Sequence, residues 1–258
     1  MVKIDNATLY NQDCLEFLKG VEGGSVDCVL VDPPYKIDTT GGGVMAKRVL
    51  KDLQAFSDGF EEDVLHELCR VLKKINIYIF CSKAQIPWLL NYFIEKKCNF
   101  DILTWHKNNP LPFCGDSYLP DTEYILFFRE KGVFFGGTYA TKKKFYISNS
   151  NTTDKKLYGH PTCKPVELLK RFIINSSQEN DLVLDCFSGS GSTAVACLQE
   201  GRQFIGCERD KTYFDNSIER LKNWKEDLAR QEKWLEDRGV EDFKSDIQPE
   251  NEQCDLFK

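Results

Sequence analysis

Short apolar runs alternate with segments of helical periodicity along most of this chain. The apolar runs predict strands at 7–10, 26–31, 75–81, 100–105, 124–128, 182–186 and 203–207. The segments between them predict helices at 14–19, 61–74, 84–97, 165–175 and 192–200. Such alternation is typical of an α/β fold, a mostly parallel sheet covered by helices. The Cys-Val-Leu-Val run at 28–31 is apolar on both faces, so we expect this strand near the middle of the sheet.

After residue 209 the pattern changes to one long helix and a polar tail. Apolar residues spaced by four, three and seven positions predict an amphipathic helix that covers the sheet. They are Phe214, Ile218, Leu221 and Leu228. From Gly239 the chain is polar and acidic, which is typical of a disordered tail. We therefore expect one folded domain over residues 1–225, and a helix end with an acidic disordered tail over 226–258.

Composition excludes several classes of protein. No apolar run approaches the roughly 20 residues that cross a bilayer, and the first residues contain no apolar signal segment. We therefore expect a cytoplasmic protein without membrane spans. The 11 cysteines include no Cys-x-x-Cys pair, which argues against a disulfide framework and against a zinc site.

The net charge of −6 is concentrated at one end of the chain. Residues 226–258 contain 11 acidic and 5 basic residues, so the rest of the chain is neutral overall. Within that part, residues 142–171 contain eight basic and two acidic residues, interleaved with aromatic ones. This stretch is a candidate for contacts with nucleic-acid phosphates, although a charge run is more often a solvated surface.

A strand, a glycine-rich turn and a helix start follow one another over residues 182–193. Gly189 and Gly191 allow a sharp bend and a close approach to a ligand, and the N-terminus of the helix offers free N–H groups. Glu208 follows the next strand, where a carboxylate can accept hydrogen bonds from both hydroxyls of a ribose. The segment therefore predicts a cofactor that carries adenosine. Taken alone, it also fits a dinucleotide-binding fold or a plain glycine turn.

The tetrapeptide Asp32-Pro33-Pro34-Tyr35 directly follows the Cys-Val-Leu-Val strand. Two prolines remove two backbone donors and leave their carbonyls as acceptors, which suits an amino group. Asp32 can accept one N–H of an exocyclic amine and the Pro33 carbonyl the other, while the Tyr35 ring can stack on the base. Standing alone, the tetrapeptide would be an ordinary proline turn that closes a strand.

Together with the glycine loop, this tetrapeptide resembles the catalytic motif of the DNA methyltransferases that methylate amino groups. In that family Asp, Asn or Ser precedes Pro-Pro and an aromatic residue, and S-adenosylmethionine binds at a Phe-x-Gly-x-Gly loop. The order of the two motifs is similar to the beta class of the family. Further matching segments lie in family order, and together they cover nearly all of residues 4–221. They are 11–14, 105–112, 121–128 and 160–165.

The resemblance implies a Rossmann-like, S-adenosylmethionine-dependent methyltransferase fold, with helices on both faces of the sheet and a long C-terminal helix. It implies methyl transfer from S-adenosylmethionine to adenine N6 in double-stranded DNA, after the base has been flipped out of the duplex. Residues 1–225 then form the catalytic domain. Its two long stretches without a periodic pattern are expected to be a mobile loop over 36–58 and a target-recognition region over 131–160.

The resemblance also assigns residues to roles, without a metal and without a catalytic cysteine. The catalytic residues are Asp32, Pro33, Pro34 and Tyr35, and Asp32 also lies next to the cofactor. Asp13 is assigned to the cofactor adenine and Glu208 to its ribose. Asp185 and Gly189 are assigned to the loop near its methionine portion, to which Gly191 and Phe187 also belong, and Phe187 could instead pack against the helix. The methionine end is assigned to His160, Thr162 and Lys164. Asp13 could instead cap a helix, and Lys164 could belong to a solvated basic face.

Several alternatives stay open. A cytosine-N4 enzyme more often has Ser at the position of Asp32, and an RNA amino methyltransferase more often has Asn. An NAD-dependent oxidoreductase would use the glycine loop and Glu208, but it leaves the tetrapeptide and residues 160–165 unexplained. A non-catalytic DNA-binding module is disfavoured by the intact tetrapeptide.

Two partners besides DNA are expected from resemblance. A homodimer is one, because the chain has little room for a target-recognition insert. The bacterial sliding clamp is the other, since residues 253–257 resemble its docking peptide, with Gln253, Leu256 and Phe257 as the contact residues. Cys254 replaces the leucine of that peptide. The sequence gives no indication of a companion restriction nuclease.

Overall fold

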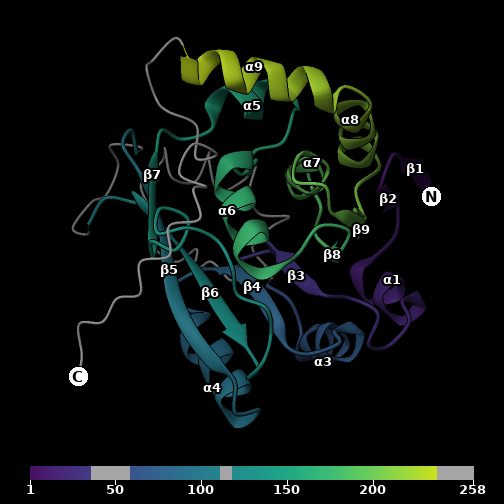
Figure 1. The fold of residues 1–258 in the computed structure, drawn as a ribbon, viewed down its shortest axis with the longest axis vertical. Coiled ribbons are helices and arrows are strands. Elements are labelled where there is room, and N and C mark those ends of the chain that lie inside the picture. Colours follow the sequence, from purple (N-terminus) through teal and green to yellow (C-terminus); the bar gives the residue numbers. More distant parts are fainter. Residues whose placement is uncertain (36–58, 111–117, 237–258) are drawn as a thin grey trace, which may run out of the picture.

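Nine strands form one mixed sheet in the computed structural model, which describes residues 1–35, 59–110 and 118–236 (Figure 1). From one edge to the other they are β1 (Val2–Ile4), β2 (Ala7–Tyr10), β9 (Gln203–Cys207), β8 (Leu182–Asp185), β3 (Cys28–Val31), β4 (Asn76–Cys81), β6 (Thr122–Arg129), β5 (Asn99–Lys107) and β7 (Phe145–Ser148). The predicted loop at 36–58 and the tail from 239 lie outside the described residues.

Most neighbouring strands run parallel, as predicted. The parallel pairs are β2–β9, β9–β8, β8–β3, β3–β4 and β5–β7. β6 runs antiparallel to both β4 and β5, and β1 runs antiparallel to β2. β3 is the fifth strand of the nine, and all four of its residues are buried. Its continuous apolar sequence therefore correctly predicted the centre of the sheet.

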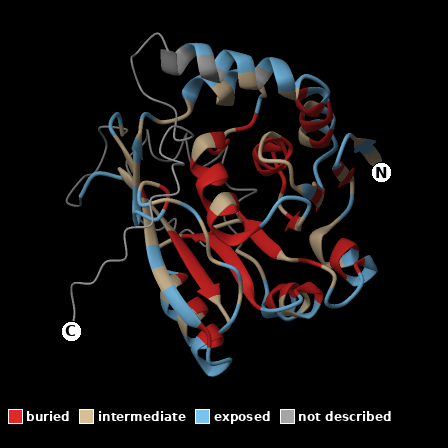
Figure 2. Cartoon of the chain, in the orientation of Figure 1, coloured by how far each residue is buried: buried red, intermediate tan, exposed pale blue. Residues whose placement is uncertain are grey.

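Helices cover both faces of the sheet (Figure 1). One face packs against α6 (Val166–Ser176), α7 (Ser192–Gln199) and α8 (Lys211–Lys222), and the other against α1 (Cys14–Gly20), α3 (Glu62–Val71) and α4 (Ile86–Glu95). Two further helices are α5 (Thr152–Leu157) and α9 (Trp224–Glu236). The helix sides that face the sheet are buried (Figure 2). The Rossmann-like α/β prediction is confirmed.

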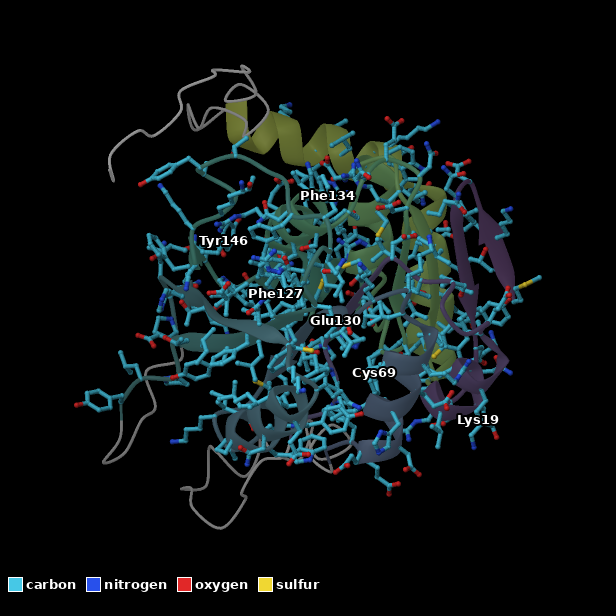
Figure 3. All side chains as sticks on the ribbon, turned by 60° about the horizontal axis from the view of Figure 1, so that its bottom comes forward. Lys19, Cys69, Phe127, Glu130, Phe134 and Tyr146 are labelled. Carbon is cyan, nitrogen blue, oxygen red and sulfur yellow. The ribbon has the colours of Figure 1, made fainter. Side chains whose placement is uncertain are left out.

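Aromatic stacking fills one of the two cores. The ring of Tyr78 on β4 stacks between Phe127 on β6 and Phe172 on α6, at centroid distances of 4.1 and 4.6 Å. Figure 3 shows Phe127 among the interior side chains and Lys19, near the end of α1, at the periphery. The three rings join two strands to the helix that follows the 160–165 segment.

Three sequence predictions differ from the structure, and the first difference is that β1 was not predicted. The single long helix after residue 209 is two helices, α8 and α9, separated at Asn223, whose side chain donates to the Glu219 carbonyl at 3.0 Å. The stretch 131–160 is not wholly irregular, since it contains β7 and α5. No helix within the described residues is long and apolar enough to cross a membrane.

Candidate active site

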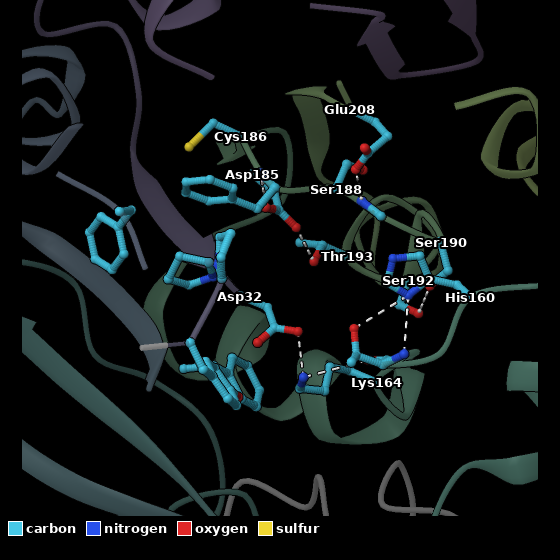
Figure 4. A pocket seen from close by; sticks show the side chains of 18 of the residues that line it. Asp32, His160, Lys164, Asp185, Cys186, Ser188, Ser190, Ser192, Thr193 and Glu208 are labelled. Atoms are coloured by element: carbon cyan, nitrogen blue, oxygen red, sulfur yellow. Dashed lines mark hydrogen bonds and ion pairs between the residues drawn. The ribbon is translucent and has the colours of Figure 1, made fainter. Parts of the chain in front are cut away.

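A cavity of about 920 Å³ opens where the parallel strands end (Figure 4). Carboxyl ends of parallel strands share one edge of the sheet, and ligands of open α/β folds bind there. Asp32 follows β3, Asp185 ends β8 and Glu208 follows β9. The start of α1 and the segment before α6 complete the wall with Asp13 and His160. The volume is in the range of about 300–1,000 Å³ typical of small-molecule sites.

The predicted site residues converge on this cavity with one exception. Its lining includes Asp13, Asp32, Pro33, Pro34, Tyr35, His160, Thr162, Lys164, Asp185, Phe187, Gly189 and Glu208. Gly191 is not among the lining residues. It is the N-cap of α7 with a φ of +73°, and a Cβ there would lie 3.2 Å from the Ser217 side chain on α8. The second glycine of the loop therefore serves helix packing.

Hydrogen bonds shape the glycine loop from both sides. Gly189 has a φ of +50° and donates its N–H to Glu208 Oε2 at 2.9 Å. The other oxygen of Glu208 accepts the Asp210 N–H at 2.7 Å. Asp185 accepts from the Phe187 N–H at 2.9 Å and from Thr193 Oγ1 at 2.7 Å. The two carboxylates thus fix the loop while bordering the cavity.

The walls of this part of the cavity fit an adenosine-bearing ligand. A Cβ on Gly189 would lie 2.8 Å from His160 Nε2, so glycine allows the His160 ring to pack against the loop at the cavity wall. Ser188 Oγ is buried without a hydrogen-bond partner among the described residues, and it borders the cavity. The ring centroids of Phe60 and Phe187 lie 6.1 Å apart, and both rings give the cavity wall an apolar surface. Acceptors for hydroxyls therefore lie beside an apolar surface for a base.

Burial changes the protonation of two groups on these walls. It raises the pKa of Asp185 to about 7, although the Thr193 and Phe187 hydrogen bonds oppose this shift. Burial also lowers the pKa of His160 to about 4, with help from the nearby cations Lys164 and Lys155. His160 is therefore neutral near pH 7, and its Nδ1 accepts the Thr162 N–H at 3.3 Å.

Asp13 has the capping role that the sequence left as an alternative. Its side chain accepts the Leu15 N–H at 2.9 Å and begins α1. It also borders the cavity. The two roles are compatible, because a carboxylate has two oxygens and several lone pairs.

Charged side chains surround Asp32. Lys164 Nζ forms an ion pair with Asp32 Oδ2 and lies 3.4 Å from Glu123 Oε2. Lys107 Nζ lies 2.6 Å from Glu123 Oε1, and the Tyr35 hydroxyl donates to Glu123 Oε2 at 3.4 Å. The predicted methionine-end ligand Lys164 thus lies in the cavity with Asp32 and Glu123 as its partners.

Sequence reasoning missed Glu123, Lys107 and Lys155, which also line the cavity. Glu123 and Lys107 lie within the matching segments 121–128 and 105–112. The available signal was a charged residue at the end of an otherwise apolar strand. Because β5 and β6 are antiparallel neighbours, the end of one meets the start of the other.

The basic stretch 142–171 is not one solvated surface. Lys164 and Lys170 are buried in ion pairs with carboxylates. Arg171 is buried and donates to the carbonyls of Phe145, Ala140, Thr141 and Lys143. Four lysines of the stretch are exposed, namely Lys142, Lys143, Lys144 and Lys156, and Lys144 pairs with Asp101 at 2.5 Å.

Comparison with known sequences finds one matching family and similar type II methyltransferases. Residues 26–219 match a protein family described as DNA methylase, N6/N4 type. The chain is 32% identical over 248 residues to the type II methyltransferase M.HinfI of Haemophilus influenzae, which covers 84% of this chain and 69% of that protein. It is 31% identical over 242 residues to the type II methyltransferase M2.LlaDCHI of Lactococcus lactis subsp. cremoris, with 84% and 90% covered.

Two solved structures are similar to this chain in fold. The M1.HpyAVI–SAM complex superposes with a TM-score of 0.63 at 26% identity, covering 83% of this chain and 99% of that one. The cytosine-N4-specific PvuII DNA methyltransferase has a TM-score of 0.66 at 17% identity, covering 86% and 92%. At that identity the second likeness concerns the fold alone.

Proposed function

The chain belongs to the N6/N4 DNA methylase family, and from this membership we propose that it methylates the N6 amino group of adenine in double-stranded DNA. The methyl donor is S-adenosylmethionine. The observation that carries the proposal is Asp32 with its following prolines at the cavity edge, facing the hollow that the glycine loop borders (Figure 4).

The glycine-loop side of the cavity suits the methyl donor. When bound, S-adenosylmethionine supplies a methyl group on a positively charged sulfur. Glu208 would accept hydrogen bonds from the ribose hydroxyls, and Asp13 and Phe187 would border the adenine. Asp185, Gly189, His160 and Thr162 would line the methionine portion. The geometry around Gly189 supports this assignment, because a larger residue would displace the His160 ring that lines the same part of the cavity.

The other side of the cavity suits a flat base with an amino group. Adenine N6 is paired and stacked in a duplex, so the base must be flipped out at a cost of a few kcal/mol. Tyr35 and Pro34 border the space that would receive it. Asp32 and the Pro33 carbonyl would each accept one N–H, which directs the nitrogen lone pair toward the methyl group. The carboxylate also stabilises the positive charge that develops on nitrogen, and a proton then leaves.

Adenine is preferred over cytosine because of Asp32. The resemblance at this position favours adenine N6, whereas Ser is more frequent in enzymes for cytosine N4. The fold does not decide between them, since a cytosine-N4-specific enzyme has it too. A cytosine-N4 or RNA amino methyltransferase is therefore the second candidate, and an NAD-dependent oxidoreductase is more remote.

Two measurements separate the proposed function from an oxidoreductase and from an RNA methyltransferase. Calorimetric titration with S-adenosylmethionine and with NAD compares the cofactors, and we expect binding of the first alone. Transfer of a labelled methyl group to duplex DNA and to RNA compares the substrates. Preferential labelling of RNA, or binding of NAD alone, would contradict the proposal.

The protein context is proposed from resemblance. The relatives named above are type II methyltransferases, so we place this enzyme in a restriction–modification setting. A homodimer would add recognition surface, and light scattering of the purified protein tests it. Docking on the sliding clamp through Gln253, Leu256 and Phe257 rests on the sequence, because these residues lie outside the described structure.

A further inference from the structure

Glu123 is the meeting point of three side chains from different parts of the chain. It lies near the start of β6 and contacts Lys107 at the end of β5, Lys164 before α6 and the Tyr35 hydroxyl after β3, at 2.6, 3.4 and 3.4 Å. All four residues border the cavity. Only Tyr35 and Lys164 were expected in the site from the sequence.

Lys164 is buried among oppositely charged and aromatic side chains at the wall of the cavity. Its side chain is 7% exposed, and its ammonium contacts carboxylates of both Asp32 and Glu123. The rings of Tyr35 and Phe80 lie 5.6 and 5.0 Å from the same nitrogen, within the range of cation–π attraction. The Thr162 carbonyl lies 3.5 Å away. The ammonium is therefore held in one place by oppositely charged and aromatic groups.

Electrostatics gives this cation a definite consequence for Asp32. Burial raises the pKa of Asp32, Lys164 opposes that rise, and the neighbouring Glu123 adds to it. For Glu123 burial also favours the neutral form, but Lys164 and Lys107 outweigh it and lower the pKa to about 2. Without Lys164, two buried carboxylates would face each other and one would take up a proton. A protonated Asp32 would donate a hydrogen bond where the target amine needs an acceptor.

We propose that Lys164 and Glu123 are positioning residues for Asp32: Lys164 holds the Asp32 carboxylate ionised and oriented for the target amino group, and Glu123 holds Lys164. The inference rests on the proposed amino methylation. It assigns Lys164 to the catalytic aspartate instead of the methionine end of the cofactor. Lys107 balances the second negative charge of the group.

The groups that face Asp32 fix the signs of the expected pH effects. They are Lys164, Glu123, the Tyr35 hydroxyl and, more weakly, Asp185, with Lys107 and Lys155 acting on Glu123 and Lys164. Removing the Lys164 cation raises the pKa of Asp32, which moves the acid limb of the kcat profile to higher pH. Removing the Glu123 anion lowers the pKa of Asp32, which moves that limb to lower pH.

Lys164→Met and Glu123→Gln test the proposal, with Lys170→Met as the matched control. Lys170 is also a buried lysine that bridges two carboxylates, Glu167 and Glu200, each at 3.3 Å, but it does not border the cavity. The Lys170→Met variant shows how far the loss of a buried lysine bridge by itself changes kcat and thermal stability. Each variant is assayed for kcat against pH on duplex DNA, for S-adenosylmethionine affinity by calorimetry and for thermal unfolding.

For Lys164→Met we expect kcat to fall about 100-fold or more at neutral pH, with S-adenosylmethionine affinity within about threefold of wild type. The acid limb shifts upward in this variant and downward in Glu123→Gln, whose kcat falls about 10-fold. Lys170→Met keeps the kcat and the acid limb of the wild type. The isosteric Glu123→Gln change decides the question if Lys164→Met does not fold.

Three outcomes would overturn the proposal. Loss of S-adenosylmethionine affinity in Lys164→Met with kcat retained at saturation would make Lys164 a cofactor ligand. An acid limb that stays in place, or that moves the same way in both variants, would make the group purely structural. No methyl transfer to DNA by the wild-type enzyme would contradict the proposed function itself, which the same assay measures first.

Discussion

Lys164 forms an ion pair with Asp32, although 132 residues separate them in the sequence. Asp32 lies at the end of the central strand β3, and Lys164 lies just before α6. The pair brings the tetrapeptide and the 160–165 segment, two of the motifs that identify the family, into one charged group. The cavity therefore has a defined acceptor for an amine beside a loop shaped for a cofactor.

Asp32→Ala removes that acceptor. We expect kcat to fall about 100-fold or more, while DNA affinity stays close to wild type because phosphate contacts position the duplex. Methyl incorporation and gel-shift titration measure the two quantities. Asp215→Ala is the control, since Asp215 is exposed on α8 and pairs with Lys211. Near wild-type incorporation by Asp32→Ala would refute the catalytic assignment.

Gly189→Ala places a methyl group against the His160 ring, which lines the cavity. The left-handed φ of +50° is strained for alanine, and the new Cβ would lie 2.8 Å from His160 Nε2. Strain of this kind costs about 1–3 kcal/mol, so we expect S-adenosylmethionine affinity to fall about tenfold or more. Gly20→Ala is the control, because no heavy atom lies within 4 Å of its Cβ position. Equal affinities of the two variants in calorimetry would speak against a cofactor at Gly189.

Asp185 predicts a pH dependence of stability. Burial raises its pKa to about 7 in the folded protein, against about 3.9 in an unfolded chain. The folded state therefore holds a proton that the unfolded state releases. The stabilisation is complete below about pH 4 and is lost as the pH rises toward 7.

Asp185→Asn removes this titration and keeps one acceptor oxygen for the Phe187 N–H, while its NH2 group can donate to the Thr193 hydroxyl. Relative to the variant, the wild-type protein should lose free energy of unfolding between pH 4 and pH 8. Thermal denaturation without ligand, across that range, measures the difference. A wild-type minus variant difference that is constant with pH would contradict the raised pKa.

Apolar patterns predicted the strands and helices whose ends are determined by the residues next to them in the sequence. β2 and β9 begin and end where the sequence predicted, because each apolar run there is bounded by polar residues. β1, β7 and α5 were missed because all three are short. Among the described strands β7 pairs with β5 alone, and Arg171 donates to four carbonyls around its start. Such stabilisation comes from distant residues and leaves no local periodicity.

The break between α8 and α9 is another feature that local periodicity did not predict. The apolar stripe continues past Leu221, so periodicity predicted one helix. The helix instead ends near Asn223, and Trp224 donates its indole N–H to Asp5 at 2.8 Å. The site residues of the motifs were predictable because they follow strand ends. The partners of Lys164 were not, since they depend on which strand ends meet.

The tail predicts docking on the sliding clamp. Leu256 and Phe257 would fill an apolar pocket of the clamp, and Gln253 would bind at its rim. We expect a peptide of the final residues to bind purified bacterial clamp, and its Leu256→Ala, Phe257→Ala counterpart to bind at least about tenfold more weakly. Fluorescence anisotropy measures both. Equal binding of the two peptides, or none at high micromolar concentration, would exclude this partner.

The identity of the methylated nucleoside tests the central claim most directly. Duplex DNA is incubated with the enzyme and with S-adenosylmethionine that carries a deuterated methyl group, then digested to nucleosides and analysed by mass spectrometry. The Asp32→Ala variant provides the background. We predict label in N6-methyldeoxyadenosine alone. Label in N4-methyldeoxycytidine, or no label above that background, would contradict the account.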